Sequence, residues 1–397
     1  MTNSSLKRIF ILFYSLLIIA ALFPVEAFAS TRISVLTSMP CDQEIYTLWG
    51  HSAIRVKTEE RDCVYNYGVF SFGEGFVYKF VKGETDYWLQ REHMNSVFSE
   101  VSLEKNTYFY EQVLNVSEEE ASAIYEALKL NALKENRYYR YNFFYDICAT
   151  RPRDLIEKIL GDLDYPKLNN TDTYRDKVHA LTEKEPWLLF GIDLCLGSET
   201  DRIISDYDVM FLPHELMLAY DKTNRMKDGQ KVPLIQETNV LYKPYPKEEN
   251  PTPFWLTPIF VFAFLAILIA LFTLWQYKTR NKNVLIDCIL FGVYGLIGLL
   301  LFFLTFFSTH PCVNPNFNLF WCNPVQLLFP LFYFIKPLKR VLTIYLWANI
   351  FTCLIPIIGY SFIPQEFHIA VIPLAIIMVV RSFFLLVIRG EIKKIQF

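Results

Sequence analysis

The chain has 397 residues, of which 53% are hydrophobic and 17% aromatic, and its formal net charge is −3 at pH 7. This nearly balanced charge provides no general attraction to nucleic acid, so we expect no nucleic-acid partner. Charged and apolar residues are mixed up to about Pro251, whereas long uncharged runs dominate from Phe254 onward. The chain therefore divides into a water-soluble half and a membrane half.

Residues 1–29 have the layout of a secretory signal peptide. Lys7 and Arg8 precede an apolar stretch over residues 9–23, and Ala27-Phe28-Ala29 forms a small-residue cleavage site before Ser30. The apolar stretch is shorter than the roughly 20 residues that a spanning helix needs, which makes an uncleaved anchor the weaker alternative. Because Ser30 rather than cysteine follows the site, we expect no lipid on the mature N-terminus.

Residues 30–240 are predicted to form an exported α+β domain. Runs of β-branched and aromatic residues predict the strands of a small antiparallel sheet at Ile33–Thr37, Ser52–Val56 and Cys63–Phe70. Helical spacing of apolar residues predicts helices over residues 117–134, N-capped by Ser117, and over residues 149–160, ended by Gly161. Prolines and charges over residues 241–253 indicate an extended linker into the membrane half.

Residues 254–397 contain five segments that are long and apolar enough to span a bilayer. We predict spans near residues 254–277, 285–307, 319–335, 341–360 and 367–388, the third of which is interrupted by Pro324 and Pro330. Basic residues follow the first, third and fifth spans, namely Lys278, Arg280, Lys282, Lys336, Lys339, Arg340, Arg389, Lys393 and Lys394. With an exported N-terminus, every basic cluster lies on the cytoplasmic side, as the positive-inside rule requires.

Six of the eight cysteines lie in segments that this topology exposes to an oxidising compartment. The spacing of Cys41 and Cys63, and that of Cys312 and Cys322, permits loop disulfides, although spacing alone does not define the pairing. Cys288 and Cys353 lie within predicted spans, where we expect small buried hydrophobic side chains.

A histidine and a cysteine are the candidates for chemistry in the exported domain. His51 stands at the start of a predicted strand and Cys148 at the start of a predicted helix, whose dipole favours a thiolate. Arg151, one turn further along, adds positive charge. A neutral His51 can take the thiol proton and return it to a leaving group. Asn66 and Arg55 are candidates for the third polar group that orients the imidazole.

The residue types alone also fit a structural role for Cys148 and a turn role for His51, because isolated cysteines and histidines are common. The six histidines are scattered, and no Cys-x-x-Cys or His-x-x-x-His spacing occurs, so we predict no metal site and no cofactor.

The loop between the second and third predicted spans carries a second group of candidates, His310, Asn314, Asn316 and Asn318. At the bilayer surface these side chains are placed to contact lipid headgroups. The alternative is a capped interfacial loop with Trp321 as a belt residue.

Three motifs of the exported domain resemble those of the Lnb family of bacterial lipoprotein N-acyltransferases: Trp49-Gly50-His51-Ser-Ala-Ile-Arg55, Tyr145-Asp-Ile-Cys148-Ala-Thr-Arg151 and Met210-Phe-Leu-Pro213. The membrane half is similar too, with His310-Pro311 and the asparagine series before a proline-broken span. The resemblance covers nearly the whole mature chain. It implies a circularly permuted papain-like fold of the NlpC/P60 and LRAT-like kind, in which the histidine precedes the cysteine.

One position departs from the family pattern, because Ile147 stands where the family usually has an asparagine directly before the cysteine. If that asparagine supplies a hydrogen bond to the site, Asn142 and Asp146 are the candidates to replace it. Loss of one oxyanion donor elsewhere costs about 10²–10³ in rate.

The resemblance implies a membrane acyltransferase in the bacterial cytoplasmic (inner) membrane, with the N-terminal domain in the periplasm and the C-terminus in the cytoplasm. Cys148 would take an acyl chain from a phospholipid and pass it to the α-amino group of a diacylated lipoprotein. A cysteine peptidase or amidase acting on peptidoglycan peptides is the first alternative, although it leaves five spans unexplained. A non-catalytic envelope binding or sensory module is the second. The sequence defines neither the oligomeric state nor the chain-length preference.

Overall fold

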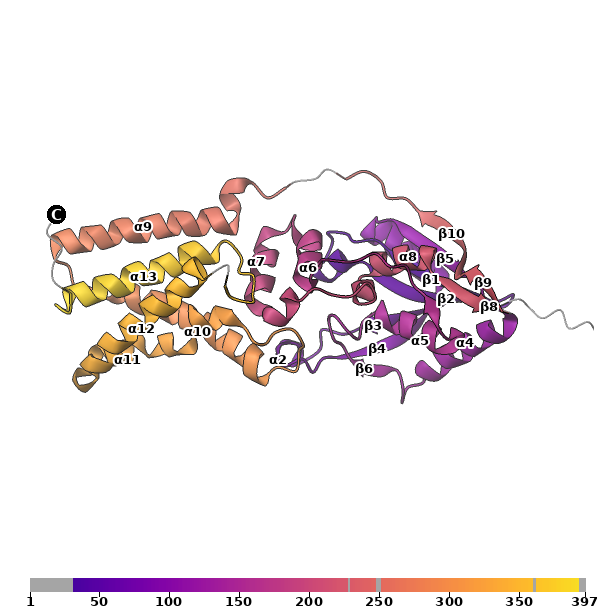
Figure 1. Cartoon of the computed structure of the whole chain (residues 1–397), viewed down its shortest axis with the longest axis horizontal. Helices are drawn as coiled ribbons and strands as arrows, with labels where there is room; N and C mark the ends of the chain where they lie inside the picture. Colours follow the sequence, from indigo (N-terminus) through magenta and orange to yellow (C-terminus); the bar gives the residue numbers. More distant parts are fainter. Residues whose placement is uncertain (1–30, 228, 248–250, 360–361, 393–397) are drawn as a thin grey trace, which may run out of the picture.

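The computed structural model describes residues 31–227, 229–247, 251–359 and 362–392. Two parts lie end to end, a β-rich domain and a bundle of apolar helices (Figure 1). This arrangement confirms an α+β domain followed by a helical membrane region. The predicted signal peptide lies outside the described residues.

A seven-stranded antiparallel sheet forms the centre of the first domain, with strand order β10-β5-β1-β2-β3-β4-β6. The three predicted strands are confirmed as β1, β2 and β3, and four further strands extend the sheet on both sides. The strands are β1 Arg32–Ser38, β2 His51–Lys57, β3 Asp62–Val69, β4 Asp86–His93, β5 Phe109–Leu114, β6 Tyr138–Arg140 and β10 Ile235–Tyr242. A small second sheet contains β7 Leu163–Asp164, β8 Asn224–Lys227 and β9 Gln230–Pro233.

Three helices pack on one face of the large sheet: α4 Glu118–Asn131, α5 Thr150–Leu160 and α8 Pro213–Lys222. The α4 N-terminus forms the predicted cap, because Ser117 Oγ accepts from the Glu120 amide while the Glu120 carboxylate accepts from the Ser117 amide. Ile54, Ile124 and Ile156 are fully buried between this face and the helices. Each such side chain contributes about 1.5–3 kcal/mol to the stability of the layer.

The opposite face of the sheet carries α3 Met94–Ser99, which continues into a turn of π-helix at Glu100–Lys105. Leu36, Ala53 and Val97 form a small apolar core beneath these turns. Helix α3 and the π-helical turn leave the beginning of β2 uncovered, and a pocket lies there.

Helices α6 Tyr174–Thr182 and α7 Pro186–Cys195 lie between the sheet domain and the bundle (Figure 1). The fully buried guanidinium of Arg175 on α6 forms ion pairs of 2.7 Å with Asp193 of α7 and with Asp201. On the other side of α7, Phe190 and Leu194 pack into the apolar core of the membrane helices. These two helices therefore join the two parts by buried contacts.

Among the described residues, four helices are long and apolar enough to cross a membrane, namely α9 Pro258–Thr279, α10 Leu285–Phe307, α12 Lys339–Ile358 and α13 Val371–Ile388. They confirm four of the five predicted spans. The third predicted span, residues 319–335, is not one continuous helix but belongs to three short ones, Phe317–Phe320, Pro324–Leu328 and α11 Phe329–Phe334. Pro324 and Pro330 each stand in the first turn of a new helix, where the missing N–H is tolerated.

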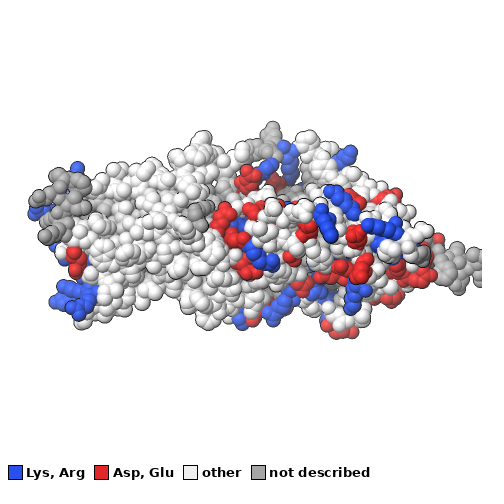
Figure 2. All heavy atoms as spheres, viewed as in Figure 1, with Lys and Arg blue, Asp and Glu red and all other residues white. Residues whose placement is uncertain are grey.

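The charges on the surface follow this division. On the face shown in Figure 2, a wide band of the bundle has no charged side chains, between the charged sheet domain and a group of mostly basic residues at the far end. The exposed lysines and arginines at that end belong to the α9–α10 loop and to the segment that leads into α12. Such a band is the surface that a bilayer covers.

One ion pair is completely buried inside the bundle. Arg381 of α13 donates two hydrogen bonds to the Asp287 carboxylate of α10, at 2.7 and 2.8 Å, and both side chains are 0% exposed. The remaining guanidinium nitrogen donates to Thr273 and Gln276 of α9. Three membrane helices are thus joined at one fully hydrogen-bonded site.

We expect Arg381→Met to destabilise the bundle by about 3–5 kcal/mol, because the substitution leaves Asp287 as an unpaired buried charge. Thermal unfolding of the full chain in detergent should show the loss as a lower Tm. The double variant Asp287→Leu, Arg381→Met should be more stable than the single one. A single variant as stable as the parent chain would contradict this view of the ion pair.

Candidate functional site

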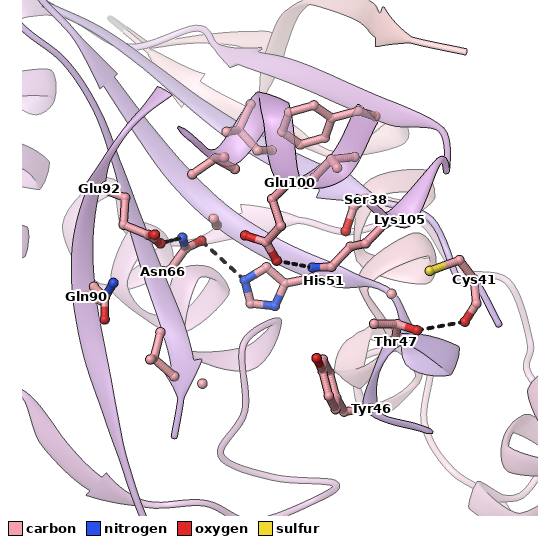
Figure 3. A pocket seen from close by; sticks show the side chains of 18 of the residues that line it. Ser38, Cys41, Tyr46, Thr47, His51, Asn66, Gln90, Glu92, Glu100 and Lys105 are labelled. Carbon is pink, nitrogen blue, oxygen red and sulfur yellow. Dashed lines mark hydrogen bonds and ion pairs between the residues drawn. The ribbon is translucent and has the colours of Figure 1, made fainter. Parts of the chain in front are cut away.

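A cavity of about 320 Å³ lies on the partly uncovered face of the sheet, at the beginning of β2. Its polar wall contains His51, Asn66, Glu92, Glu100 and Lys105, which Figure 3 shows around the imidazole. Its aromatic lining residues are Tyr46, Phe70, Phe72 and Phe109. The cavity is thus lined by both polar and aromatic side chains.

A chain of hydrogen bonds orients the half-buried imidazole of His51. Asn66 Nδ2 donates to a carboxylate oxygen of Glu92, which can only accept, so the amide oxygen of Asn66 faces His51. The distance from that oxygen to His51 Nε2 is 3.3 Å (Figure 3). His51 Nε2 must therefore carry the proton, and Nδ1 keeps a free lone pair. This arrangement makes Nδ1 the basic nitrogen of the ring.

The surroundings of His51 keep it neutral. Burial lowers the pKa of His51 to about 4, and the positive charge of Lys105 acts in the same direction. The Asn66 hydrogen bond and the charge of Glu100 oppose this effect. Lys105 and Glu100 form an ion pair with each other, at 2.7 Å. A neutral imidazole is the form that can accept a proton.

Cys148 lies at the start of α5 with its side chain 8% exposed. Burial raises the pKa of the Cys148 thiol, and backbone N–H groups of Ser52, Cys148 and Ala149 oppose this rise. Helix α5 packs against β2, the strand that begins with His51. The beginning of β2 and the beginning of α5 meet at this point.

Gly68 is the residue between Cys148 and the cavity. It lines the cavity and has a φ of +96°, a conformation that favours glycine. A Cβ atom at this position would lie 3.6 Å from the Cys148 Cβ and 3.9 Å from the hydroxyl of Tyr139. The glycine therefore keeps the thiol close to the cavity that contains His51.

Most of the supporting residues predicted for the site have other partners. Arg55 forms ion pairs with Asp62 at 2.6 Å and Glu111 at 2.9 Å, so of the two candidates only Asn66 contacts His51. Arg151 pairs with Asp146 at 2.5 Å, and its guanidinium lies 3.6 Å from the centroid of the Tyr139 ring. The expected positive charge beside Cys148 is thus largely neutralised by Asp146.

The turn before Cys148 is held by backbone and side-chain contacts of its own residues. Asn142 accepts the amides of Phe144 and Asp146, which closes the turn. Ile147 is 5% exposed and packs into an apolar cluster with Phe144 and residues of α6. The Ile147 amide donates to Thr150 Oγ1 at 2.9 Å. Ile147 therefore fixes the position of Cys148 through packing.

The predicted membrane-loop residues contact the exported domain. Asn316 donates to the carbonyls of Leu194 and Cys195, and Asn318 donates to those of Asp193 and Leu194, all in the last turn of α7. His310 Nε2 lies 2.5 Å from the Phe80 carbonyl, whereas Asn314 donates to the Thr305 carbonyl at the end of α10. These contacts cap helices and join the two parts of the chain.

All eight cysteines, which lie within the described residues, are free thiols, so neither Cys41 with Cys63 nor Cys312 with Cys322 forms a disulfide. Cys312 Sγ lies 3.5 Å from the Tyr145 hydroxyl, and Cys322 donates to the Tyr294 carbonyl. Within the described part of the chain, no group of three or more His, Cys, Asp or Glu side chains is arranged to hold a metal ion.

Several residues of the site were not identified from the sequence, namely Gly68, Glu92, Glu100, Lys105 and Tyr139. Tyr139 belongs to β6, and its hydroxyl is buried without a hydrogen-bond partner among the described residues. An unpaired buried donor next to a buried thiol is available for a substrate oxygen. No sequence pattern marks it, because β6 has only three residues.

Comparisons with known proteins agree with this division of the chain. The model of the Lnb N-terminal periplasmic domain matches residues 26–180, and the model of the Lnb transmembrane domain matches residues 248–393. No curated protein and no solved structure matches the chain.

The neutral forms of both side chains predict how Cys148 reacts with iodoacetamide at different pH values. His51 loses its proton at a pKa of about 4 and the thiol has a raised pKa, so between these two values the pair is uncharged. We therefore expect the rate of Cys148 alkylation, measured by peptide mass spectrometry, to rise about tenfold for each unit by which the pH is raised through the neutral and mildly alkaline range. A rate that is constant from about pH 5 to about pH 8 would instead indicate a thiolate–imidazolium pair.

Proposed function

Because the chain belongs to the Lnb family of membrane proteins, we propose that it is a membrane-bound lipoprotein N-acyltransferase whose nucleophile is Cys148. Its partners are a phospholipid as acyl donor, a diacylated lipoprotein as acceptor and the surrounding membrane lipids. The main support is Gly68, which lines the cavity that contains His51 and approaches Cys148 so closely that a Cβ atom on it would lie 3.6 Å from the Cys148 Cβ. Cys148 therefore lies next to the wall of the cavity that contains the neutral base.

The first half of the proposed reaction forms a thioester. His51 Nδ1 takes the proton of the Cys148 thiol, and the sulfur attacks the carbonyl carbon of a phospholipid acyl ester. The bond between the acyl carbon and the glycerol oxygen then breaks. The lysophospholipid leaves with this oxygen, which takes up the proton that His51 returns. Hydrogen bonding by Asn66 and Glu92 keeps the ring of His51 in the tautomer that this step needs.

The second half transfers the acyl chain to an amine. The neutral α-amino group of the diacylglyceryl-cysteine attacks the thioester carbonyl, and His51 accepts one of its protons. The C–S bond breaks as the amide forms, and His51 returns the proton to the Cys148 sulfur. Both halves pass through a tetrahedral oxyanion, for which the backbone amides at the start of α5 and the Tyr139 hydroxyl are the candidate donors.

We also propose that the chain crosses the bacterial inner membrane five times, with its C-terminus in the cytoplasm. The proline-broken segment after α10 runs back along that helix, because its successive residues contact earlier and earlier turns. Asn323 approaches Gly298, Leu327 approaches Gly295, and the Phe329 ring stacks on Phe291 with centroids 4.4 Å apart.

The polar groups of this broken segment have partners inside the bundle. Gln326 donates to the Trp321 carbonyl and to Asn349 of α12, and Asn349 donates to Ser382 of α13. Broken helices are tolerated at membrane depth only where such partners exist. These contacts support a third crossing that is built from short helices.

We expect Cys148→Ala to abolish N-acylation of lipoproteins while the protein still inserts into the membrane. Mass spectra of a lipoprotein N-terminus, from a deletion strain complemented with the variant, should lack the mass of the third acyl chain. Cys63→Ala is the matched control, because Cys63 is a half-buried thiol at the opposite end of β3 from Gly68, which adjoins Cys148. Unchanged lipoprotein masses with Cys148→Ala would refute the proposed function, and cell-wall digestion by the protein would favour the peptidase alternative.

Tyr139→Phe tests the proposed oxyanion contact. The substitution removes one hydroxyl that has no partner among the described residues, so the fold should be retained. Removal of one oxyanion donor lowers kcat by about 10²–10³ in other enzymes, and we expect a loss of this order. Rates of acyl transfer in detergent micelles would provide the measurement. A variant with full activity would show that Tyr139 does not stabilise the oxyanion.

A further inference from the structure

A row of aromatic side chains leads from the cavity to the membrane helices. Phe70 and Phe72 line the cavity, and their ring centroids lie 5.0 Å apart. Phe72 contacts Phe76 at 4.9 Å, and Phe76 contacts Phe80 at 5.7 Å, both on helix α2 Phe76–Lys82. The Phe80 ring in turn lies 5.8 Å from the His310 ring. Each ring in the series therefore touches the next.

Helix α2 lies at the level where α10 leaves the bundle (Figure 1). Thr309, two residues after the end of α10, donates its backbone amide to the Lys82 carbonyl at 2.8 Å. Gly83 follows α2, and a Cβ atom there would lie 2.7 Å from Thr309 Oγ1, so the two segments are in close contact. These contacts fix α2 at the membrane-facing end of the exported domain.

The outer surface of α2 is exposed and carries apolar side chains beside the exposed Lys79. Phe72 is 74%, Val77 73% and Tyr78 62% exposed, and no residue of this seven-residue helix is buried. At the neighbouring end of α10, Phe306 and Phe307 are 63% and 59% exposed. Exposed apolar side chains thus lie both on α2 and at the end of α10, which contact each other, and a group of exposed apolar side chains of this kind marks an interaction site.

We propose that the exposed side chains of Val77 and Tyr78 on α2, together with Phe72 before this helix, bind an acyl chain of a membrane phospholipid and guide its ester carbonyl to the cavity. The bilayer is the occupant that fits, because these side chains lie beside the exposed apolar end of α10. The polar end of the cavity with His51 then receives the ester, while the aromatic row holds the chain. This inference rests on the proposed function, since it supplies the route of the acyl donor.

The first test needs no turnover. The full-length Cys148→Ala protein is reconstituted in phosphatidylglycerol vesicles that contain a phosphatidylglycerol with a diazirine at the end of one acyl chain. After irradiation, lipid adducts should be found on peptides of α2 as well as on those of α9–α13. Adducts on the bundle but none on α2 would overturn the proposal. Chemical cross-links between α2 peptides of two chains would overturn it as well, in favour of an interface between copies.

The second test separates the surface from the chemistry. The double variant Val77→Ser, Tyr78→Ser changes two side chains that do not line the cavity. The matched control is the double variant Leu130→Ser, Leu133→Ser, which changes two exposed side chains elsewhere on the exported domain. We expect the α2 variant to lose at least about tenfold in transfer from a long-chain phospholipid. Its acylation by a water-soluble short-chain p-nitrophenyl ester, and both activities of the control, should not change.

These outcomes distinguish the two proposals. An α2 variant that retains long-chain transfer would overturn the role of the surface and leave the acyltransferase function intact. A parent protein that is acylated neither by the long-chain phospholipid nor by the p-nitrophenyl ester would instead count against the proposed function. The lipid adducts would still show whether α2 contacts acyl chains.

Discussion

The contact between the end of α7 and the loop after α10 is the interaction on which the working arrangement of this protein depends. The last carbonyls of a helix have no partner within the helix. In α7 they accept hydrogen bonds from Asn316 and Asn318, which belong to the membrane half. The two asparagine side chains are 4% and 1% exposed, so these bonds are shielded from water. The exported domain is thereby held rigidly on the bundle.

This junction determines how the site faces the membrane. Arg175 ties α6 to α7 through Asp193, and the loop that follows α10 also holds α2 through Thr309. The same loop therefore contacts the exported domain at two separate places. A second contact removes the freedom to rotate about the first, and the orientation of the cavity relative to the bundle becomes fixed. An enzyme that takes a substrate from the bilayer benefits from such a fixed orientation, because positioning lowers the entropic part of the barrier.

The sequence predicted the elements that have local signals. The first three strands, the two long helices of the exported domain and four spans all follow from periodicity, capping or hydropathy over short windows. The Ser117 cap and the Gly161 stop are examples, since each depends only on residues within one turn. The broken third span is the counterexample, because its composition is apolar while Pro324 and Pro330 restart the helix.

The elements and site residues that the sequence did not predict depend on the pairing of strands that lie far apart in the chain. Strand β10 joins the sheet beside β5, far away in the sequence, and no local pattern reveals that pairing. The same holds for the site: Asn66 was a candidate because it stands near His51 on the neighbouring strand. Glu92 reaches Asn66 only through the register of β3 and β4, which the sequence does not contain. Residue types thus indicated the chemistry, and strand register selected the partners.

Burial shifts the pKa values of both candidate residues away from their charged forms. It raises the pKa of the Cys148 thiol and lowers that of His51, so the resting pair is uncharged. In the proposed reaction, charge would then develop only when an ester carbonyl is present to receive the attack. The burial that makes Cys148 a weak nucleophile at rest would therefore tie its reaction to the arrival of the ester.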